Sequence, residues 1–536
     1  MDLPEEMLAD ILRRVPARHL AACRRVYGYW RAIIDARRLL LPHLLTGAPS
    51  GAFVNMPEAS RDTYFFARGG PTGGVDTRLA DAPTRWCTAF LDHRNGLLLC
   101  ESSEDTRFVY NPATRRSAVP PPAPRAEPWG VASAAYLVFD PFVSLHHEVL
   151  LLPELPGEPH PPEPTDPPPL PPFNIARLFF EDAESSPPPQ IDTDEEDWLS
   201  SDSEDEPWKL ARPRQHEHIE AKDTLGLMEW PLSPYVVQVF SSETDRWDDR
   251  AFFREGAAAG TVADMWSYPL SSSYVMGSYL PALVEKEAMV QAGPAHYADC
   301  GPRRHDAVYW RQSLYVHCRG GFIIRLSLLT GKYVVIKTPG VTNVAERPWA
   351  MPRLSKSRMG VYCTIIDMLK LQVWVLTEES PMATPVWEIA HHADLEPSIR
   401  QLMRKHLKNT EKSWILDDPR RPKSSAEQRC REWDSDNDDD DGAYVEEEEG
   451  GGAFGWLDFL GYHPHKEIVF LGHQYKRCAY AYYLNTSKLE YLGDLCPVPD
   501  DYFPACVQES YVYTPCRIDL LSDENGVSVD LSKWVS

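Results

Sequence analysis

The sequence lacks the residue patterns that mark catalytic, metal-binding and membrane-spanning proteins. It holds 11 cysteines but no CxxC pair, and it has no HExxH, no GxSxG, no Walker loop and no GxGxxG after a strand-like run. No uninterrupted apolar stretch is long enough to cross a bilayer, and MDLPEEM at the start carries no signal segment. These absences predict an intracellular protein of the cytoplasm or nucleus, with reduced cysteines, no metal, no cofactor and no catalytic residue.

Basic residues are also few. The 54 Lys and Arg stand against 79 Asp and Glu, for a net charge of -25. Two tracts without any Lys or Arg, 192–206 and 434–449, hold nine and ten of the carboxylates. No basic face remains for nucleic acid, and no membrane contact is expected. Because 14 of the 49 prolines lie in 153–189, we predict two disordered inserts, a proline-rich and acidic one at 153–232 and an acidic one at 410–453.

The first 45 residues are different, because apolar residues recur there at helical spacing. Pro4 stands where a missing N–H costs little, and Glu5 and Glu6 follow, where carboxylates suit the helix dipole. We predict three short helices, the first of which ends at Pro16. A unit this small buries too little apolar surface to stand alone, and its helices carry more apolar residues than one small core needs. A second polypeptide is therefore expected to cover part of it.

This segment resembles an F-box, a motif that docks a Skp-type adaptor and through it a cullin. The matching positions are Leu3, Pro4, Glu6, Ile11, Leu12, Arg14, Pro16, Leu20, Val26, Trp30, Arg31 and Ile34. Tyr27-Gly28 departs from the usual Cys-Lys. The resemblance implies an adaptor-binding face that we assign to Leu3, Pro4, Leu8, Ile11, Leu12, Val15, Pro16, Leu20, Val26, Trp30 and Ile34.

After Gly51 the pattern changes to short β-type runs with turn signals. One unit recurs four times: an alternating strand, a turn with Thr, any residue and Arg or Lys, then a second strand, at 107–122, 235–249, 321–339 and 479–495. A single hairpin of this kind is unstable alone, so the copies must pack together. Repeated antiparallel units suggest a β-propeller, for which the length could accommodate five to seven blades.

Longer phrases of this part resemble the F-box-associated propellers of plant, especially grass, F-box proteins. They include AYLVFDP, HHEVLLLPE, YVVQVFSSETDRWDDR and AVYWRQSLYVHCRGGFIIRLSLLTGKYVVIKTP. The expected fold is mainly β with a small N-terminal α domain, a three-helix F-box followed by a β-propeller-like domain. The boundaries we expect are 1–45 for the F-box, and 46–152, 233–409 and 454–536 for the three parts of the propeller-like domain.

The resemblance implies a non-catalytic substrate-recognition subunit of an SCF-type cullin-RING ubiquitin ligase, whose propeller binds a target protein for ubiquitination. Three alternatives stay open. The helices could be a hairpin that caps the next domain, or a degenerate F-box on a ligase-independent interaction scaffold, which Tyr27-Gly28 favours. The β part could also be a propeller enzyme or a glycan-binding module. The sequence does not name the target.

Overall fold

The computed structural model describes five helices and 26 strands, in two compact units formed by contacts within the chain. One unit comprises 1–157 and 229–536 and holds all of these elements, and the other comprises 158–228. The described residues are 4–40, 49–55, 63–68, 75–79, 81–83, 87–102, 106–123, 133–156, 224–267, 302–318, 320–339, 350, 352–357, 360–378, 385–406, 414–417, 457–473, 477–495, 507 and 509–518.

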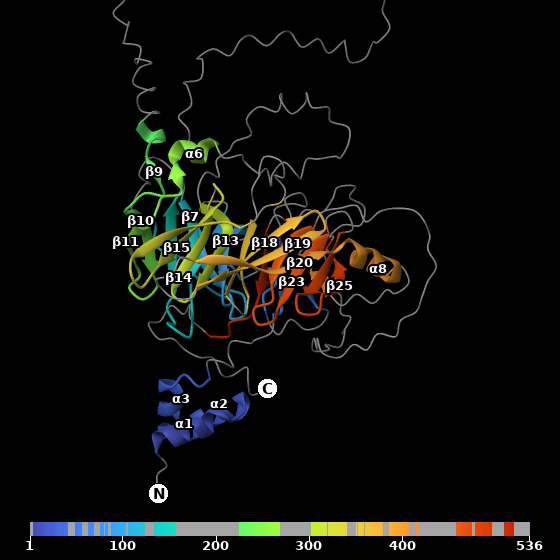
Figure 1. The fold of residues 1–536 in the computed structure, drawn as a ribbon. Helices are drawn as coiled ribbons and strands as arrows, with labels where there is room; N and C mark the ends of the chain where they lie inside the picture. Colours follow the sequence, from blue (N-terminus) through green and yellow to red (C-terminus); the bar gives the residue numbers. More distant parts are fainter. Residues whose placement is uncertain are drawn as a thin grey trace, which may run out of the picture. The chain divides into compact units, whose positions relative to one another are not determined.

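Three short helices open the chain, as the apolar spacing predicts (Figure 1). They are α1 (Glu5–Arg13), α2 (Ala17–Val26) and α3 (Gly28–Ala36). Two further helices, α6 (Val262–Ser267) and α8 (Glu396–His406), lie in connections of the β part. Among the described residues, no helix combines the length and the apolarity that a bilayer crossing needs.

The described strands form six four-stranded antiparallel sheets and one small ribbon. Sheet 1 has the order β21-β2-β1-β26, and sheet 2 the order β3-β4-β5-β6. The bounds in sheet 1 are β1 (Gly51–Asn55), β2 (Thr63–Arg68), β21 (Trp414–Asp417) and β26 (Glu509–Tyr513). Those in sheet 2 are β3 (Cys87–Arg94), β4 (Leu97–Ser102), β5 (Arg107–Asn111) and β6 (Arg116–Ala118).

Sheets 3 and 4 are joined into one eight-stranded sheet, because the end of β11 pairs in parallel with β16. Sheet 3 contains β7 (Ser133–Val138), β8 (Glu148–Pro153), β10 (Tyr235–Ser241) and β11 (Arg246–Glu255). Sheet 4 contains β13 (Pro302–Trp310), β14 (Ser313–Cys318), β15 (Phe322–Ser327) and β16 (Lys332–Lys337). The ribbon pairs β9 (Glu229–Trp230) with β12 (Gly260–Thr261).

Sheets 5 and 6 are formed by consecutive strands. Sheet 5 contains β17 (Pro352–Ser357), β18 (Gly360–Asp367), β19 (Lys370–Thr377) and β20 (Val386–Asp394). Sheet 6 contains β22 (Leu457–Tyr462), β23 (Ile468–His473), β24 (Cys478–Tyr483) and β25 (Lys488–Asp494). Every neighbouring pair inside these sheets is antiparallel.

One edge strand from each sheet contacts an edge strand of the next, and these contacts close a ring. The order is β26, β3, β7, β13, β17, β22 and back to β26. Four-stranded antiparallel sheets around a ring are the arrangement of a propeller-like fold. The mainly β fold with a small N-terminal helical unit is therefore confirmed, and the described strands form six blade-like sheets.

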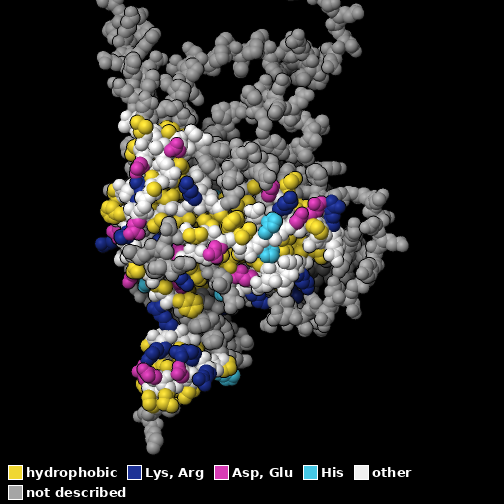
Figure 2. All heavy atoms as spheres, in the orientation of Figure 1, with side chains coloured by type: hydrophobic (Ala, Val, Ile, Leu, Met, Phe, Trp, Pro, Cys, Tyr) yellow, Lys and Arg dark blue, Asp and Glu magenta, His cyan; other side chains and the backbone are white. Residues whose placement is uncertain are grey.

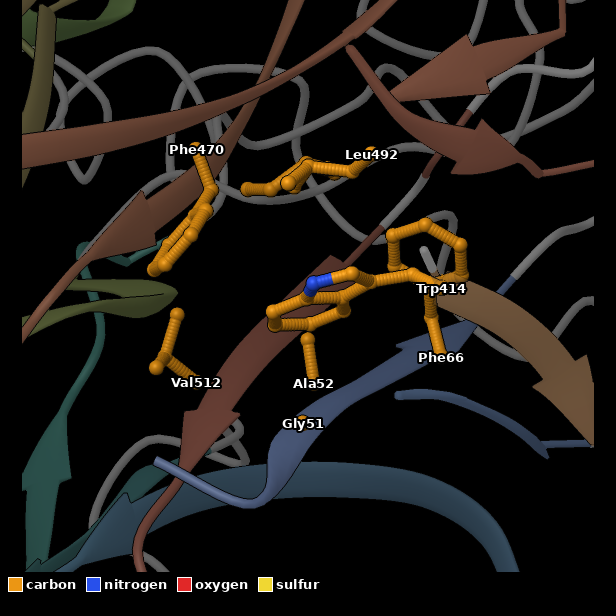
Figure 3. A pocket seen from close by; sticks show the side chains of 8 residues that line it. Gly51, Ala52, Phe66, Trp414, Phe470, Leu492 and Val512 are labelled. Carbon is orange, nitrogen blue, oxygen red and sulfur yellow. The ribbon is translucent and has the colours of Figure 1, made fainter. Parts of the chain in front are cut away.

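The ring closes in sheet 1, which draws strands from three distant parts of the chain. Its β1 pairs with β2 on one side and with β26 on the other, and β2 pairs in turn with β21. Between sheets 1 and 6 lies a small apolar cavity, lined by Phe66, Trp414 and Phe470 among others (Figure 3). Its eight lining residues carry no charged side chain, so this cavity is a feature of packing between sheets.

The four repeated turns each join the third and fourth strands of a different sheet, at β5–β6, β10–β11, β15–β16 and β24–β25. Their middle residues share a left-handed backbone: φ is 60° at Arg115, 54° at Asp245, 66° at Gly331 and 54° at Ser487. The turn requires this conformation, whereas the residue type varies. The recurring sequence unit thus reports one hairpin geometry.

Most of the two ranges predicted as inserts lies outside the described residues. The range 410–453 nevertheless contains β21, which pairs with β2 through Trp414–Arg68 to Asp417–Phe65. The range 153–232 contains β9 at its end. The bounds of both predicted inserts therefore differ from the structure. A strand of two to four residues has too little periodicity to be recognised in the sequence next to a proline-rich or acidic tract.

Candidate functional site

The helical unit at the N-terminus is the part of the chain whose apolar residues exceed its own core. Pro4 precedes α1 in an extended conformation, and the first turn holds Glu5 and Glu6. Pro16 likewise precedes α2 in an extended conformation. Tyr27, with φ -138° and ψ 122°, separates α2 from α3 and turns the chain between them. Three short helices with two sharp breaks follow directly from these residues.

The inward faces of the three helices hold a narrow apolar core. Leu8 and Leu12 of α1, Leu20 of α2, and Ile33 and Ile34 of α3 are all buried. α3 contacts both other helices, which makes it the centre of the unit. Fully burying one such side chain contributes about 1.5–3 kcal/mol, so these few residues give the helical unit only a modest stabilisation.

Ion pairs between helices supplement this core. Arg24 of α2 donates from Nε and Nη2 to the two carboxylate oxygens of Asp35 in α3, at 2.6 and 3.0 Å. Arg37, just after α3, lies 3.5 Å from the carboxylate of Glu5 in α1. Both pairs are partly exposed, so each contributes about 1 kcal/mol or less. They fix the relative rotation of the helices more than they stabilise them.

The structure divides the eleven residues assigned to the adaptor face into groups. Leu8, Leu12, Leu20 and Ile34 are buried in the core of the unit, and Val15 and Trp30 are half-buried against it. Pro4, Ile11, Pro16 and Val26 are exposed. Leu3 lies outside the described residues. The buried four can support a docking surface from beneath, and only the exposed and half-buried ones can form it.

Three exposed apolar residues were missed by the sequence assignment. Met7 lies one helical turn before Ile11 on α1, and Tyr27 and Tyr29 flank the start of α3. The exposed fractions are 55% for Met7, 49% for Ile11, 79% for Val26, 56% for Tyr27 and 45% for Tyr29. The i, i+4 spacing of Met7 and Ile11, beside that of Leu8 and Leu12 on the same helix, is the signal that could have found the first pair.

These residues form two groups. The α1 pair is Met7 and Ile11, and the junction group is Val26, Tyr27 and Tyr29. The ring of Tyr27 meets those of Tyr29 and Trp30 edge to face, with centroids 6.4 and 5.9 Å apart. On the face drawn in Figure 2, hydrophobic side chains gather at the end of the helical unit where α1 lies, beside a band of charged ones.

This arrangement has the composition of a binding surface. Large exposed apolar and aromatic side chains next to charged ones are typical of protein-protein contacts. Among the described residues, no group of three or more His, Cys, Asp or Glu is placed to hold a metal ion. Gly28 adds no constraint of its own, because a Cβ there would meet no atom within 4 Å.

Residues 1–41 match the model of the F-box domain. A search of curated proteins finds no match to the chain. The first match shows that residues 1–41 are an F-box domain. In general, proteins with this domain are non-catalytic, adaptor-binding substrate receptors of SCF-type ligases.

Proposed function

We propose that this protein is the substrate-recognition subunit of an SCF-type cullin-RING ubiquitin ligase, with its F-box on a Skp-type adaptor and its propeller-like part on a target protein. The observation that carries the proposal is the exposed apolar surface of the F-box. Five large apolar side chains in a unit of some 40 residues have exposed fractions of 45% or more. Exposed apolar groups of this kind mark sites of protein-protein interaction.

The contact with the adaptor is assigned to the α1 pair and the junction group. Met7 and Ile11 are large apolar side chains on one face of α1. Such a pair can pack against a helix of a partner protein. Tyr27 and Tyr29 add aromatic area, and aromatic residues at the centre of a contact often account for most of its binding free energy. The half-buried Trp30 supports Tyr27 from the side.

The target is assigned to the propeller-like part, at the end of the sheets from which the long connections leave. Because strands alternate in direction, the turns after first and third strands lie at one end, and the other connections at the opposite end. Turns after first strands can be as short as 95–96 and 311–312. The long connections 154–234 and 395–456 follow a second and a fourth strand, so they lie at the opposite end. Long connections on a rigid scaffold are where binding residues concentrate.

The protein itself makes and breaks no bond in this proposal. The adaptor and cullin bring a conjugating enzyme, and the propeller-like part holds the target beside it. The rate gain is one of effective concentration, since a tethered target meets the reactive thioester without diffusing to it. Binding residues, rather than acids or bases, then decide the activity.

Charge substitutions on the exposed apolar surface test the docking assignment. Ile11→Glu and Val26→Glu, singly, should weaken capture of a purified Skp-type adaptor by at least tenfold, because each buries an unpaired carboxylate in an apolar contact. Asp10→Asn, next to Ile11 and also exposed, is the matched control and should leave capture unchanged.

A second pair of variants separates docking from folding. Leu12→Ala removes a side chain that is 2% exposed, so it should destabilise the F-box by about 2–5 kcal/mol. Ile11→Glu should leave the helical circular dichroism and its melting temperature as in the wild type. Full adaptor capture by both glutamate variants would contradict the proposal.

One observation favours the scaffold alternative. Tyr27-Gly28 stands where the resembled motif has Cys-Lys, and the exposed Tyr27 lies at the junction group. A scaffold would bind the adaptor without recruiting cullin. Titration of cullin into the preformed complex of this protein and the adaptor separates the two functions, because only the ligase receptor yields a ternary complex.

A further inference from the structure

A group of cationic side chains gathers at the end of the ring where first strands turn into second strands. Arg94 ends β3, and Trp310 ends β13. Lys356 is the penultimate residue of β17. The turn 463–467 follows β22. The four segments come from sheets 2, 4, 5 and 6, so the group is assembled by the closed ring rather than by one sheet.

Short distances connect three of these segments to one another. The Nζ atom of Lys356 lies 5.0 Å from the centroid of the Trp310 ring, and the guanidinium carbon of Arg311 lies 5.6 Å from it. Arg94 donates from Nη2 to the carbonyl oxygen of Ala307, on the same strand as Trp310, at 2.9 Å. The last residues of β13 are thus contacted by Lys356 from β17 and by Arg94 from β3.

The fourth segment is tied to β17 by a hydrogen bond. The Oγ of Ser357 donates to the carbonyl oxygen of Lys466 at 3.3 Å. The Nδ1 of His463 accepts from the backbone N–H groups of His465 and Lys466, at 3.1 Å each, which orders this turn. His465 and Lys466 are therefore held near Lys356.

The charge of Lys356 is poorly compensated. Arg94 has its own carboxylate, since Asp92 lies 2.6 Å from Nη1. No ion pair to Lys356 occurs among the described residues within salt-bridge distance, and Asp140 acts on it only from farther away. Burial lowers the pKa of Lys356, Asp140 raises it and Arg94 lowers it again. Burial and then Lys356 lower the pKa of His465 in turn.

Lys356 is nevertheless exposed to solvent. Water reaches this side chain, but its surroundings remove part of the hydration of its ammonium. Its ammonium lies over an indole face, and an ammonium carries three N–H donors, so donors remain for a ligand on the side away from the ring. The cationic group is thus open to a small ligand at Lys356.

We propose that this cationic group, formed by Lys356 on Trp310 with Arg94 and His465 beside it, binds an oxyanion, either a carboxylate or a phosphate. A bound oxyanion accepts hydrogen bonds from the Lys356 ammonium. Its negative charge also reduces the repulsion between Lys356 and Arg94. Two sources share this chemistry: an acidic side chain of a bound protein and free phosphate. The site is independent of the F-box and of adaptor binding.

Calorimetric titration of the full chain tests the site with two probes, inorganic phosphate and an oligoglutamate peptide, at low salt. The wild type should bind at least one of them saturably. Lys356→Met keeps the packing on Trp310 but removes the charge, and it should weaken that binding at least tenfold. Lys370→Met, an exposed lysine at the start of β19, should have no effect.

The outcomes separate the sources. Binding of phosphate alone assigns the site to a free anion, and binding of the peptide alone assigns it to an acidic segment of a protein; either supports the proposal if Lys356→Met weakens it. Lys356→Gln serves as a second variant should Lys356→Met lower the melting temperature. No saturable binding of either probe by the wild type, or equal binding by the folded Lys356 variants, would overturn it.

Discussion

At the scale of single residues, two buried histidines, His147 and His463, and the half-buried His93 make the propeller-like part sensitive to acid. Burial, with Arg94, lowers the pKa of His93 to about 3. Burial, with His146, lowers the pKa of His147 to about 4. Burial, with His465 and Lys466, lowers the pKa of His463 to about 4. All three are held neutral in the folded protein below the pH at which a free histidine takes up a proton.

The pH dependence follows from linkage. The unfolded chain binds a proton at each histidine near pH 6.5 and the folded chain does not, so the unfolded state gains protons first as pH falls. Stability is therefore fully present above about pH 6.5 and is lost progressively down to about pH 4 for His147 and His463, and about pH 3 for His93. One pKa unit corresponds to about 1.4 kcal/mol.

His147→Phe tests this directly. The ring lies 6.3 Å from that of Phe240, and Nε2 of His147 has no hydrogen-bond partner among the described residues. Phe should therefore fit, and the loss of unfolding free energy between pH 6.5 and 4 should be smaller than in the wild type. Urea unfolding at several pH values measures it, with His392→Phe as the exposed control. An unchanged pH slope would contradict the assignment.

At the scale of elements, the four repeated turns predict opposite effects for two substitutions. Gly331 has φ of 66°, and a Cβ there would meet only the carbonyl oxygen of Ala251, at 3.6 Å. Gly331→Ala therefore tests conformation without a clash, and it should cost roughly 1 kcal/mol. Asp245 has φ of 54° in the equivalent turn, so Asp245→Gly should stabilise by a similar amount or less.

Denaturation of the two variants beside the wild type checks this prediction. Thr330→Ala, a neighbour in the same turn, controls for loss of turn contacts. A gain of stability in Gly331→Ala would show that left-handed backbone is not what the repeated motif encodes.

The elements show where the sequence is informative and where it is not. The Thr-x-basic turns were recognised because each lies in a hairpin of consecutive strands, and all four fall in separate sheets. Sheet 5 has another connection in that place, and sheet 1 is assembled from β1, β2, β21 and β26, which local pattern cannot connect. Register and closure depend on contacts between residues hundreds of positions apart.

The candidate site was predicted in kind but not in detail. The sequence assigned Leu8, Ile11 and Leu12 to one adaptor-binding face, yet Ile11 is exposed and the other two are buried. A three-helix core accepts only part of a wide apolar stripe, and which part depends on how the helices rotate against one another. The same rotation left Met7 and Tyr27 outside the core, where composition alone could not place them.

At the scale of the whole molecule, β26 closes the ring. It pairs with β1 and contacts β22 and β3, and its Tyr513 is fully buried beside Phe53, with ring centroids 5.2 Å apart. Deletion of 509–536 should remove cooperative unfolding of the β part, because sheet 1 loses the edge strand through which it contacts β3 and β22. Phe53→Ala should cost about 3–5 kcal/mol.

A shorter deletion, 519–536, leaves every described strand in place and serves as the control. It should unfold like the full chain in calorimetry. Equal cooperativity in the two truncated proteins would show that the ring does not depend on β26.

The ligase-receptor account is tested most directly by native mass spectrometry of the full chain mixed with a purified Skp-type adaptor and cullin. It predicts a complex with one copy of each, which Ile11→Glu removes and Asp10→Asn leaves intact. A chain that stays alone, or that binds the adaptor while excluding cullin, would contradict it.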